Sequence, residues 1–334
     1  PRRVHERSQC GEREVMNYIV LDLEWNQCPD GKEYADAALP FEIIEIGAVK
    51  LDQDLRMVDE FHEIIKPQVY KWIHAKTREV IHLNYKNLEN GKSFSAAVQD
   101  FLVWCGDDYC FCTWGTQDLM ELQKNMNYYQ ILDMLPGPIR YYDIQKLFSI
   151  AYEDRSSRRS LEYAIEFLKI EKKYQFHRAL SDACYAAEVL RKIEDPQVFL
   201  YDSIDVYQYP KNRKQEILIK YPTYDKFVSK DFPCKEKAIR DREVNSTRCP
   251  VCGMPAKRKI RWFTTNSKQY YSVSLCQKHG LVKGKIRMKK TDQNTFYVVK
   301  TIKLIDKKDA KKIQEKQESL RIKRQLRKSR GKEG

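Results

Sequence analysis

The alternation of apolar and polar positions changes along this chain, and the changes predict where strands and helices lie. Residues 17–26 are almost continuously apolar, which is typical of a strand at the centre of a covered sheet. Residues 43–52 and 59–66 alternate with a period of two, so we expect them to form the next two strands. Another short strand is expected at 109–114, where Gly115 stops it.

Apolar residues at helical spacing follow these strands. They appear first at 93–104, where Ser93 is placed to cap the helix start, and again from about Thr116. Strands first, then helices around a later strand, predict an α/β domain with a mixed sheet. The later helices are expected at 142–152, at 160–170 with Ser160 as the N-cap, and at 178–193.

The second half of the chain has a different pattern. Residues 195–248 lack a clean period, so we interpret them as a partly ordered connector. Residues 257–275 and 281–302 alternate well enough to be strand pairs of a small β domain. From Lys303 onward there are 13 Lys and Arg against 5 Asp and Glu, and apolar residues are too sparse for a coiled coil. That tail is expected to be helical or disordered.

These patterns divide the chain into five segments. Residues 1–15 are polar and Met16 is the expected natural start, so the segment before it is interpreted as a non-native or disordered leader. The other segments are the α/β domain (16–195), the connector (196–245), the small β domain (246–302) and the basic tail (303–334).

The composition narrows the class of protein. A chain of 334 residues, 42% of them hydrophobic, is long enough for two domains and can bury a sizeable core. It has no run of about 18 apolar residues, so no membrane span is expected. Its ten cysteines are not arranged as a disulfide framework, and we expect a reducing, cytoplasmic compartment. Those interpreted as buried free thiols are Cys105, Cys110, Cys112 and Cys184.

The net charge of +14 is unevenly distributed. Residues 1–234 carry 31 Lys and Arg against 38 Asp and Glu, a balance of −7, whereas residues 235–334 carry 30 against 9, a balance of +21. A basic half joined to an acidic half favours a polyanionic partner that the basic half binds. The alternative is that a lysine-rich tail only keeps the protein soluble.

Several acidic residues stand in local settings that favour metal chemistry. Asp22 and Glu24 are two positions apart in an apolar strand, so both carboxylates point to one face, where burial is costly unless a cation compensates them. Asp118 lies in the first turn of a helix, and Asp182 lies inside an otherwise apolar helix. His177, five positions before Asp182, can accept a proton near neutral pH. Carboxylates that hold two divalent cations, with a base nearby, are typical of phosphoryl chemistry.

Each of these residues also has a structural interpretation. Asp22 and Glu24 would face solvent if the strand were exposed on that side, and Asp118 would interact only with the helix dipole. Asp182 alone would be an ordinary surface acid, and His177 a structural histidine. The local sequence leaves these alternatives open.

Three motifs, D-x-E, W-G-x-x-D and H-x4-D, occur in this order, and together they resemble the DEDDh 3′-to-5′ exonucleases of the ribonuclease-H-like superfamily. The chain is most like the branch of histone-mRNA and small-interfering-RNA exonucleases and its bacterial relatives. The resemblance covers about residues 17–195. Further segments that carry it are FEIIEIGAVKLD at 41–52, FHEIIKP at 61–67 and TREVIHL at 77–83.

The resemblance implies a ribonuclease-H-like mixed sheet flanked by helices. It implies two Mg²⁺ or Mn²⁺ ions held by the four acids, with Asp22 bridging both ions and His177 as the general base. It also implies release of nucleoside 5′-monophosphates. The residues that would contact the last nucleotide are Trp25, Asn26 and Gln27.

A second motif favours a structural zinc ion. CPVCG at 249–253 and CQKH at 276–279 give C-x2-C, a gap of 23 residues and C-x2-H, the ligand spacing of a zinc-ribbon-like domain. Cys234 is too far away in sequence to be a ligand. The expected ligands are Cys249, Cys252, Cys276 and His279. The aromatic residues of this domain, Trp262, Phe263, Tyr270, Tyr271, Phe296 and Tyr297, would either stack on bases or form its small core.

The function that follows is a metal-dependent 3′-to-5′ exonuclease acting on single-stranded nucleic acid, with RNA favoured over DNA. No motif here senses a 2′-hydroxyl, so the preference for RNA depends on the resemblance. One alternative is an exonuclease on single-stranded DNA. Another is a regulatory nucleic-acid-binding protein in which the nuclease fold only supports interaction.

Overall fold

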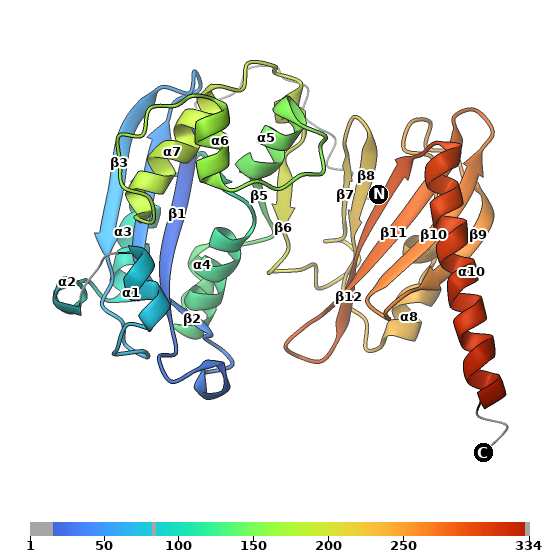
Figure 1. Cartoon of the computed structure of the whole chain (residues 1–334), viewed down its shortest axis with the longest axis horizontal. Coiled ribbons are helices and arrows are strands. Elements are labelled where there is room, and N and C mark those ends of the chain that lie inside the picture. Colours follow the sequence, from blue (N-terminus) through green and yellow to red (C-terminus); the bar gives the residue numbers. More distant parts are fainter. Residues whose placement is uncertain (1–15, 82–84, 331–334) are drawn as a thin grey trace. The chain divides into compact units, whose positions relative to one another are not determined.

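The computed structural model describes residues 16–81 and 85–330 (Figure 1). The expected leader at residues 1–15, the end of the TREVIHL segment and the last four residues of the tail lie outside this part. The chain forms two compact units, one ending at Gln208 and one beginning at Tyr209, and each is described by itself. No helix of the described residues is apolar and long enough to cross a bilayer.

The first unit contains a mixed sheet of six strands in the order β3-β2-β1-β4-β5-β6. β1 and β2 are antiparallel, as are β2 and β3, whereas β4 runs parallel to β1 and β5 runs parallel to β4. This arrangement confirms the predicted α/β fold with a ribonuclease-H-like mixed sheet. The strands are β1 (Asn17–Gln27), β2 (Phe41–Leu51), β3 (Met57–Ile64), β4 (Tyr109–Thr113), β5 (Ile139–Asp143) and β6 (Ser203–Asp205).

Helices cover both faces of this sheet (Figure 1). The predicted caps are present, because the hydroxyls of Ser93 and Ser160 accept hydrogen bonds from the backbone N–H groups of Ala96 and Tyr163. The expected helix at 142–152 begins two residues later, since Tyr142 and Asp143 still belong to β5. The helices are α1 (Ala75–Ile81), α2 (Tyr85–Glu89), α3 (Phe94–Cys105), α4 (Gln117–Tyr128), α5 (Ile144–Tyr152), α6 (Leu161–Phe167) and α7 (Ala179–Arg191).

The two faces of β1 have different neighbours. Ile19, Leu21 and Leu23 are buried in the main hydrophobic core with residues of α3 and α4. Side chains alternate along a strand, so Asp22 and Glu24 point to the other face, which α7 covers. The sheet thereby separates an apolar layer from the layer that contains the acids.

The second unit is built on an antiparallel sheet in the order β7-β8-β12-β11-β10-β9. The predicted strand pairs at 257–275 and 281–302 are confirmed as β9 to β12, and most of the basic tail is a helix, α10. The elements are β7 (Ile217–Lys220), β8 (Tyr224–Val228), α8 (Lys235–Arg240), α9 (Arg242–Asn245), β9 (Lys257–Thr264), β10 (Gln269–Cys276), β11 (Gly280–Lys290), β12 (Phe296–Leu304) and α10 (Lys307–Arg330).

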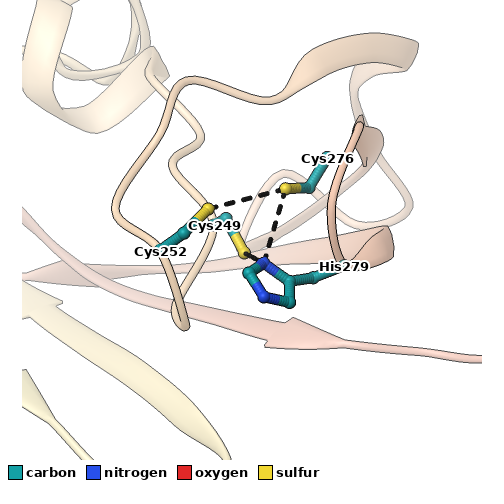
Figure 2. A group of neighbouring side chains, drawn as sticks. All are labelled: Cys249, Cys252, Cys276 and His279. Carbon is teal, nitrogen blue, oxygen red and sulfur yellow. Dashed lines mark hydrogen bonds between the residues drawn. The ribbon is translucent and has the colours of Figure 1, made fainter.

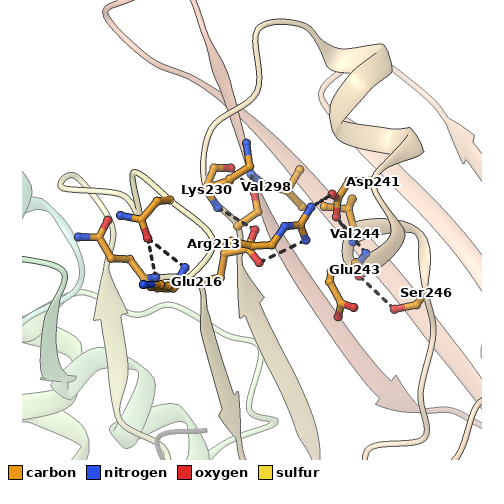
Figure 3. Close-up of polar contacts among 12 residues, drawn as sticks. Arg213, Glu216, Lys230, Asp241, Glu243, Val244, Ser246 and Val298 are labelled. Atoms are coloured by element: carbon orange, nitrogen blue, oxygen red, sulfur yellow. Dashed lines mark hydrogen bonds and ion pairs between the residues drawn. The ribbon is translucent and has the colours of Figure 1, made fainter. Parts of the chain in front are cut away.

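The segment 196–245, interpreted from the sequence as a partly ordered connector, is instead divided between the two units. It supplies β6 to the first sheet and β7, β8, α8 and α9 to the second unit. Figure 3 shows how it is fixed: Arg213 forms ion pairs with Asp241, at 2.5 Å, and with Glu216, at 3.8 Å. Asp241 also caps α9. The strands here are only three to five residues long, too short to show a period.

The aromatic residues of the second unit belong to its core or pack against it. Trp262, Tyr270 and Phe296 pack against the cluster under α8 and α9, and Phe263 packs with Tyr271 on the opposite face of the sheet. Tyr297 is buried and stacks on the Tyr209 ring. Of the two interpretations left open by the sequence, the structure supports a core role for these rings.

Candidate active site and metal centre

The acid pair of β1 lies at the centre of the first sheet. In the β1–β2 ladder, Asp22 is paired with Gly47 and Glu24 with Glu45, so three carboxylates share one face. Burial raises the pKa of Asp22 well above its usual value, and the charges of Asp118 and Asp182 add to this. Burial and then the charge of Asp182 raise the pKa of Glu24 to about 8.

Gly47 allows α7 to reach this face. A Cβ at Gly47 would lie 2.0 Å from the Leu180 backbone nitrogen, so no other residue fits between β2 and the first turn of α7. Asp182 follows Leu180 by two positions, and this close approach places its carboxylate over the acids of β1. Because Gly47 has no side chain, Asp182 of α7 can lie close to the acids of β1.

Asp118 approaches the acids of β1 from the edge of β1 that pairs with β4. β4 ends at Thr113, and Gly115, with φ +100°, turns the chain into α4, whose first turn contains Asp118. Burial raises the pKa of Asp118 to about 7, although backbone N–H groups of Asp118 and Leu23 hydrogen bond to its carboxylate. The hydrogen bond from Leu23 fixes this acid beside β1.

His177 and Asp182 are joined at the start of α7. The His177 backbone N–H donates to Asp182 Oδ2 at 3.1 Å, and His177 has a left-handed φ of 64° that turns the chain into the helix. The His177 side chain is exposed, and its ring lies with the carboxylates of Glu24 and Asp182 in a group whose ligand atoms are all within 4.8 Å. The structure thus brings together all five residues that the motifs identified.

The carboxylates fit a site for hard divalent cations. Asp182 Oδ1 is buried and has no hydrogen-bond partner in the described structure, and burial raises the pKa of Asp182 to about 6. Mg²⁺ and Mn²⁺ prefer carboxylate oxygens as ligands. A bound cation would offset the repulsion between these acids and give the unsatisfied oxygen a partner. The residues that would hold the ions are Asp22, Glu24, Asp118 and Asp182.

The three residues after Glu24 have different surroundings. Trp25 packs on the hydrophobic core, with its ring 6.1 Å from that of Phe41. Asn26 is fully buried: its Nδ2 donates to the carbonyls of Tyr70 and Trp72, and its Oδ1 accepts from the His74 backbone. We therefore correct the expectation that Asn26 contacts a nucleotide, because its polar atoms are engaged in holding the loop at residues 70–74.

Gln27 remains a candidate substrate residue. Its side-chain amide lies 3.1 Å from His74 Nδ1, and the residue is half-buried. Gln27 and His74 thus form a polar pair at the end of β1, next to the acids.

Sequence reasoning missed a network beside the acids. The Glu45 side chain is fully buried and accepts hydrogen bonds from Arg178 Nε and Nη2, the latter at 2.9 Å, and from His62 Nε2 at 2.7 Å. Burial acts to raise the pKa of Glu45, but the bonds from His62 and Arg178 hold it below the usual value. Glu45 lies within the segment FEIIEIGAVKLD and Arg178 directly follows His177, yet nothing in the sequence pairs them.

The cysteine motifs of the second unit converge in space (Figure 2). Cys249 Sγ lies 3.4 Å from His279 Nδ1, Cys252 Sγ lies 3.7 Å from Cys276 Sγ, and Cys276 Sγ lies 3.8 Å from His279 Nδ1. A tetrahedral zinc ion with Zn–S bonds of about 2.3 Å would separate two sulfurs by roughly 3.8 Å. The four side chains therefore have the spacing that one tetrahedral ion requires.

Glycines close both turns that carry this cluster. Gly253 and Gly280 have φ angles of +69° and +85°, and the Gly253 N–H donates to the Cys249 carbonyl at 2.9 Å. Cys234 lies outside the group of four, as expected. All nine cysteines of the described residues are free thiols, and Cys105, Cys112 and Cys184 are buried as predicted, while Cys110 is half-buried.

Comparisons with known proteins identify the family of the first unit. The sequence model of the RNase_T exonuclease family matches residues 19–190. A PolC-type DNA polymerase III from Thermotoga petrophila is 32% identical over 182 residues, which are 54% of this chain and 12% of the polymerase. The chain thus spans only a small part of that relative.

Solved structures of exonucleases are also similar. The nuclease domain of 3′hExo, a DEDDh family member bound to rAMP, has a TM-score of 0.47 and 17% identity over 55% of this chain and 93% of that one. A structure of exonuclease I has a TM-score of 0.46 and 12% identity over 78% of this chain and 55% of that one. Since the family match covers just over half of its residues, the chain belongs to the RNase_T exonuclease family.

Proposed function

We propose that this protein is a metal-dependent 3′-to-5′ exonuclease that hydrolyses single-stranded nucleic acid, with RNA favoured, to nucleoside 5′-monophosphates. The observation that supports it is the convergence of four acids and His177, from β1, α4 and the start of α7, around the middle of β1. Family membership supports the reaction class, and the acid set supports the need for cations.

The roles proposed for the residues follow from their positions. Asp22, Glu24, Asp118 and Asp182 would hold two Mg²⁺ or Mn²⁺ ions, which would neutralise charge at the scissile phosphate and acidify an attacking water. His177, exposed beside Glu24 and Asp182, accepts the proton of that water. The water oxygen bonds to phosphorus as the bond to the preceding 3′ oxygen breaks. Trp25 and Gln27 remain proposed neighbours of the terminal nucleotide.

The second unit is proposed to hold one structural zinc ion and to recruit the substrate. Cys249, Cys252, Cys276 and His279 leave no open position for a reacting ligand, so this metal would stabilise the fold and not react. The free thiols of the described cysteines support a reducing, cytoplasmic compartment.

A second candidate substrate is single-stranded DNA. The match to a DNA polymerase III, at 32% identity, favours it, whereas the resemblance to histone-mRNA exonucleases favours RNA. The two substrates are distinguished by incubating the full chain with 5′-labelled single-stranded RNA and single-stranded DNA of the same sequence. Each reaction contains Mg²⁺, Mn²⁺ or no divalent cation. We expect shortening from the 3′ end, faster for RNA and lost in D182N. Intact oligonucleotides under every condition would leave the regulatory, non-catalytic alternative.

A further inference from the structure

β11 carries four cationic side chains on one face of the second sheet. Lys283, Lys285, Arg287 and Lys289 occupy alternate positions, while the residues between them, such as Ile286, are buried on the other face. Two residues of a strand span about 6.8 Å, so the charges form a regular row.

The neighbours of this row include no acid. On β10 the register partners of Lys283, Lys285 and Arg287 are Val273, Tyr271 and Gln269. On β12 the partners of the four cations are Lys303, Thr301, Val299 and Tyr297. Lys283 directly faces Lys303, and like charges at such positions destabilise a sheet. Opposite charges on neighbouring strands would stabilise the sheet. The row of cations instead lowers the stability of the folded unit, and a bound anion would restore part of it.

α10 adds a further cation above the same face. Tyr271 lies beneath three ammonium groups: the Nζ atoms of Lys283 and Lys285 are each 5.9 Å from its ring centroid, and that of Lys316 is 4.8 Å away. Burial lowers the pKa of Lys285, and so do the charges of its cationic neighbours, of which Arg287 contributes most. The structure gives these lysines no ion pair within the described residues.

The acid whose charge acts on Lys283 is already engaged. Asp309 of α10 raises the pKa of Lys283, which burial and the neighbouring lysines lower, but its carboxylate forms its ion pair with Lys312, at 3.5 Å. The positive field of this face is therefore only partly offset by acids among the described residues of the unit. We call the set Lys283, Lys285, Arg287, Lys289, Lys303 and Lys316 the lysine face.

We propose that the lysine face binds the phosphate backbone of single-stranded nucleic acid and delivers it to the nuclease. This inference rests on the proposed function, which supplies a polyphosphate substrate. The regular row of charges suits repeated phosphates, whereas a membrane surface would also need exposed apolar anchors. The apolar and aromatic register partners of the row, Val273, Tyr271, Val299 and Tyr297, are at most 9% exposed. Binding should therefore depend little on base identity, because the aromatic rings next to the row are buried and do not offer a stacking surface.

The test compares two charge-matched triple variants of the full chain. K283Q/K285Q/R287Q removes three charges of the row, and K214Q/K220Q/K237Q removes three exposed lysines elsewhere on the same unit. Binding of a fluorescent 20-nucleotide single-stranded RNA is measured by anisotropy between 50 and 300 mM salt, without divalent cations or chelator. Each lost phosphate contact lowers the slope of log Kd against log salt by about 0.7.

We expect the row variant to lose about 2 from that slope and to bind roughly 10- to 100-fold more weakly at 100 mM salt. The control triple should change far less, and K283R/K285R/R287K, which keeps the charges, should bind like the unaltered protein. Equal weakening in both glutamine triples would overturn the proposal. So would vesicles with phosphatidylserine that bind through the row while RNA binding is unchanged.

A separate readout keeps the two proposals distinguishable. Hydrolysis of the p-nitrophenyl ester of thymidine 5′-monophosphate with Mn²⁺ needs only the acid site, so the row variant should retain it and D182N should lose it. If the ester is hydrolysed but RNA binding ignores the row, the lysine face is wrongly assigned and the nuclease stands. If binding depends on the row but the ester is stable, the nuclease assignment fails by itself.

Discussion

Glu45 and Arg178, 133 residues apart in sequence, form a two-point ion pair directly beside the proposed catalytic acids. Glu45 is the cross-strand neighbour of Glu24, and Arg178 lies between His177 and the first residue of α7. The pair therefore joins β2, which lies next to the proposed cation ligand Glu24, to the loop that carries His177, the proposed general base. We infer that Glu45 positions His177 through Arg178.

Removing Arg178 should weaken both the fold and turnover. R178A leaves the fully buried Glu45 carboxylate with only the His62 ring as a side-chain hydrogen-bond partner, which should lower the free energy of unfolding by about 2–3 kcal/mol. This loss of unfolding free energy is smaller than for a fully buried ion pair because the Arg178 side chain is 30% exposed, and solvent weakens the interaction. We expect kcat to fall at least tenfold with little change in KM, since the loop that carries His177 loses its anchor. Urea unfolding and steady-state kinetics measure the two effects.

A matched control is the exposed pair of Arg191 and Glu188 on the same helix, at 2.7 Å. R191A should cost less than about 1 kcal/mol and leave kcat unchanged. A result in which R178A and R191A behave alike would show that the Glu45–Arg178 pair has no positioning role.

The acid cluster should make the cation-free protein less stable as pH rises. Burial and mutual repulsion raise the pKa values of Asp182, Asp118 and Glu24 to about 6, 7 and 8. The folded state then binds protons that the unfolded chain has released, so the free energy of unfolding falls between about pH 5 and pH 8. The loss should be at least 1 kcal/mol, because one pKa unit corresponds to about 1.4 kcal/mol.

Denaturant titrations at pH 5.5, 7 and 8.5, without divalent salts and then with 10 mM Mg²⁺, measure this effect. Magnesium should restore stability most at pH 8.5, where more of these carboxylates are charged than at pH 5.5 or 7. D182N should flatten the cation-free profile. Stability that rises with pH in the absence of cations would mean that the acids are not close together in solution.

Gly47 should tolerate no side chain. G47A places a methyl group against the Leu180 backbone, so α7 must move away from β2 and carry Asp182 with it. We expect the free energy of unfolding to fall by about 1–3 kcal/mol and turnover to drop by more than an order of magnitude. Raising the Mg²⁺ or Mn²⁺ concentration should recover part of the turnover, since a displaced ligand weakens cation binding. G47A with unaltered kinetics would contradict the close approach of strand and helix.

What the sequence predicted depends on how local each signal is. Asp22 and Glu24 could be placed on one face because the period of a strand is two. Gly47 and Leu180 approach each other only through tertiary packing, so nothing local announces that contact. β5 was missed because its five residues run directly into α5, whose helical spacing dominates the pattern.

The same limit explains the incorrect interpretation of residues 196–245. β7 and β8 are short strands at one side of the second sheet. They pair with each other, and β8 also pairs with β12, about 70 residues later. These strands are structured because of that long-range pairing and the Arg213–Asp241 ion pair. Neither contact produces a periodic pattern in the local sequence. The convergence of Cys249, Cys252, Cys276 and His279 was easier to predict, since their spacing within each turn is local.

The zinc motif leads to a last prediction, for the stability of the second unit. The chain as purified should contain one zinc ion, measured by elemental analysis, and C252S should lose it. C234S is the matched control, because Cys234 lies in the same unit but outside the group of four ligands. Structural zinc contributes on the order of 10 kcal/mol to small domains, so C252S should also lose the cooperative unfolding of this unit. Because the acids of the first unit share no ligand with this cluster, C252S should still hydrolyse the thymidine ester. If C252S retains its zinc, or C234S loses it, another set of ligands binds the metal.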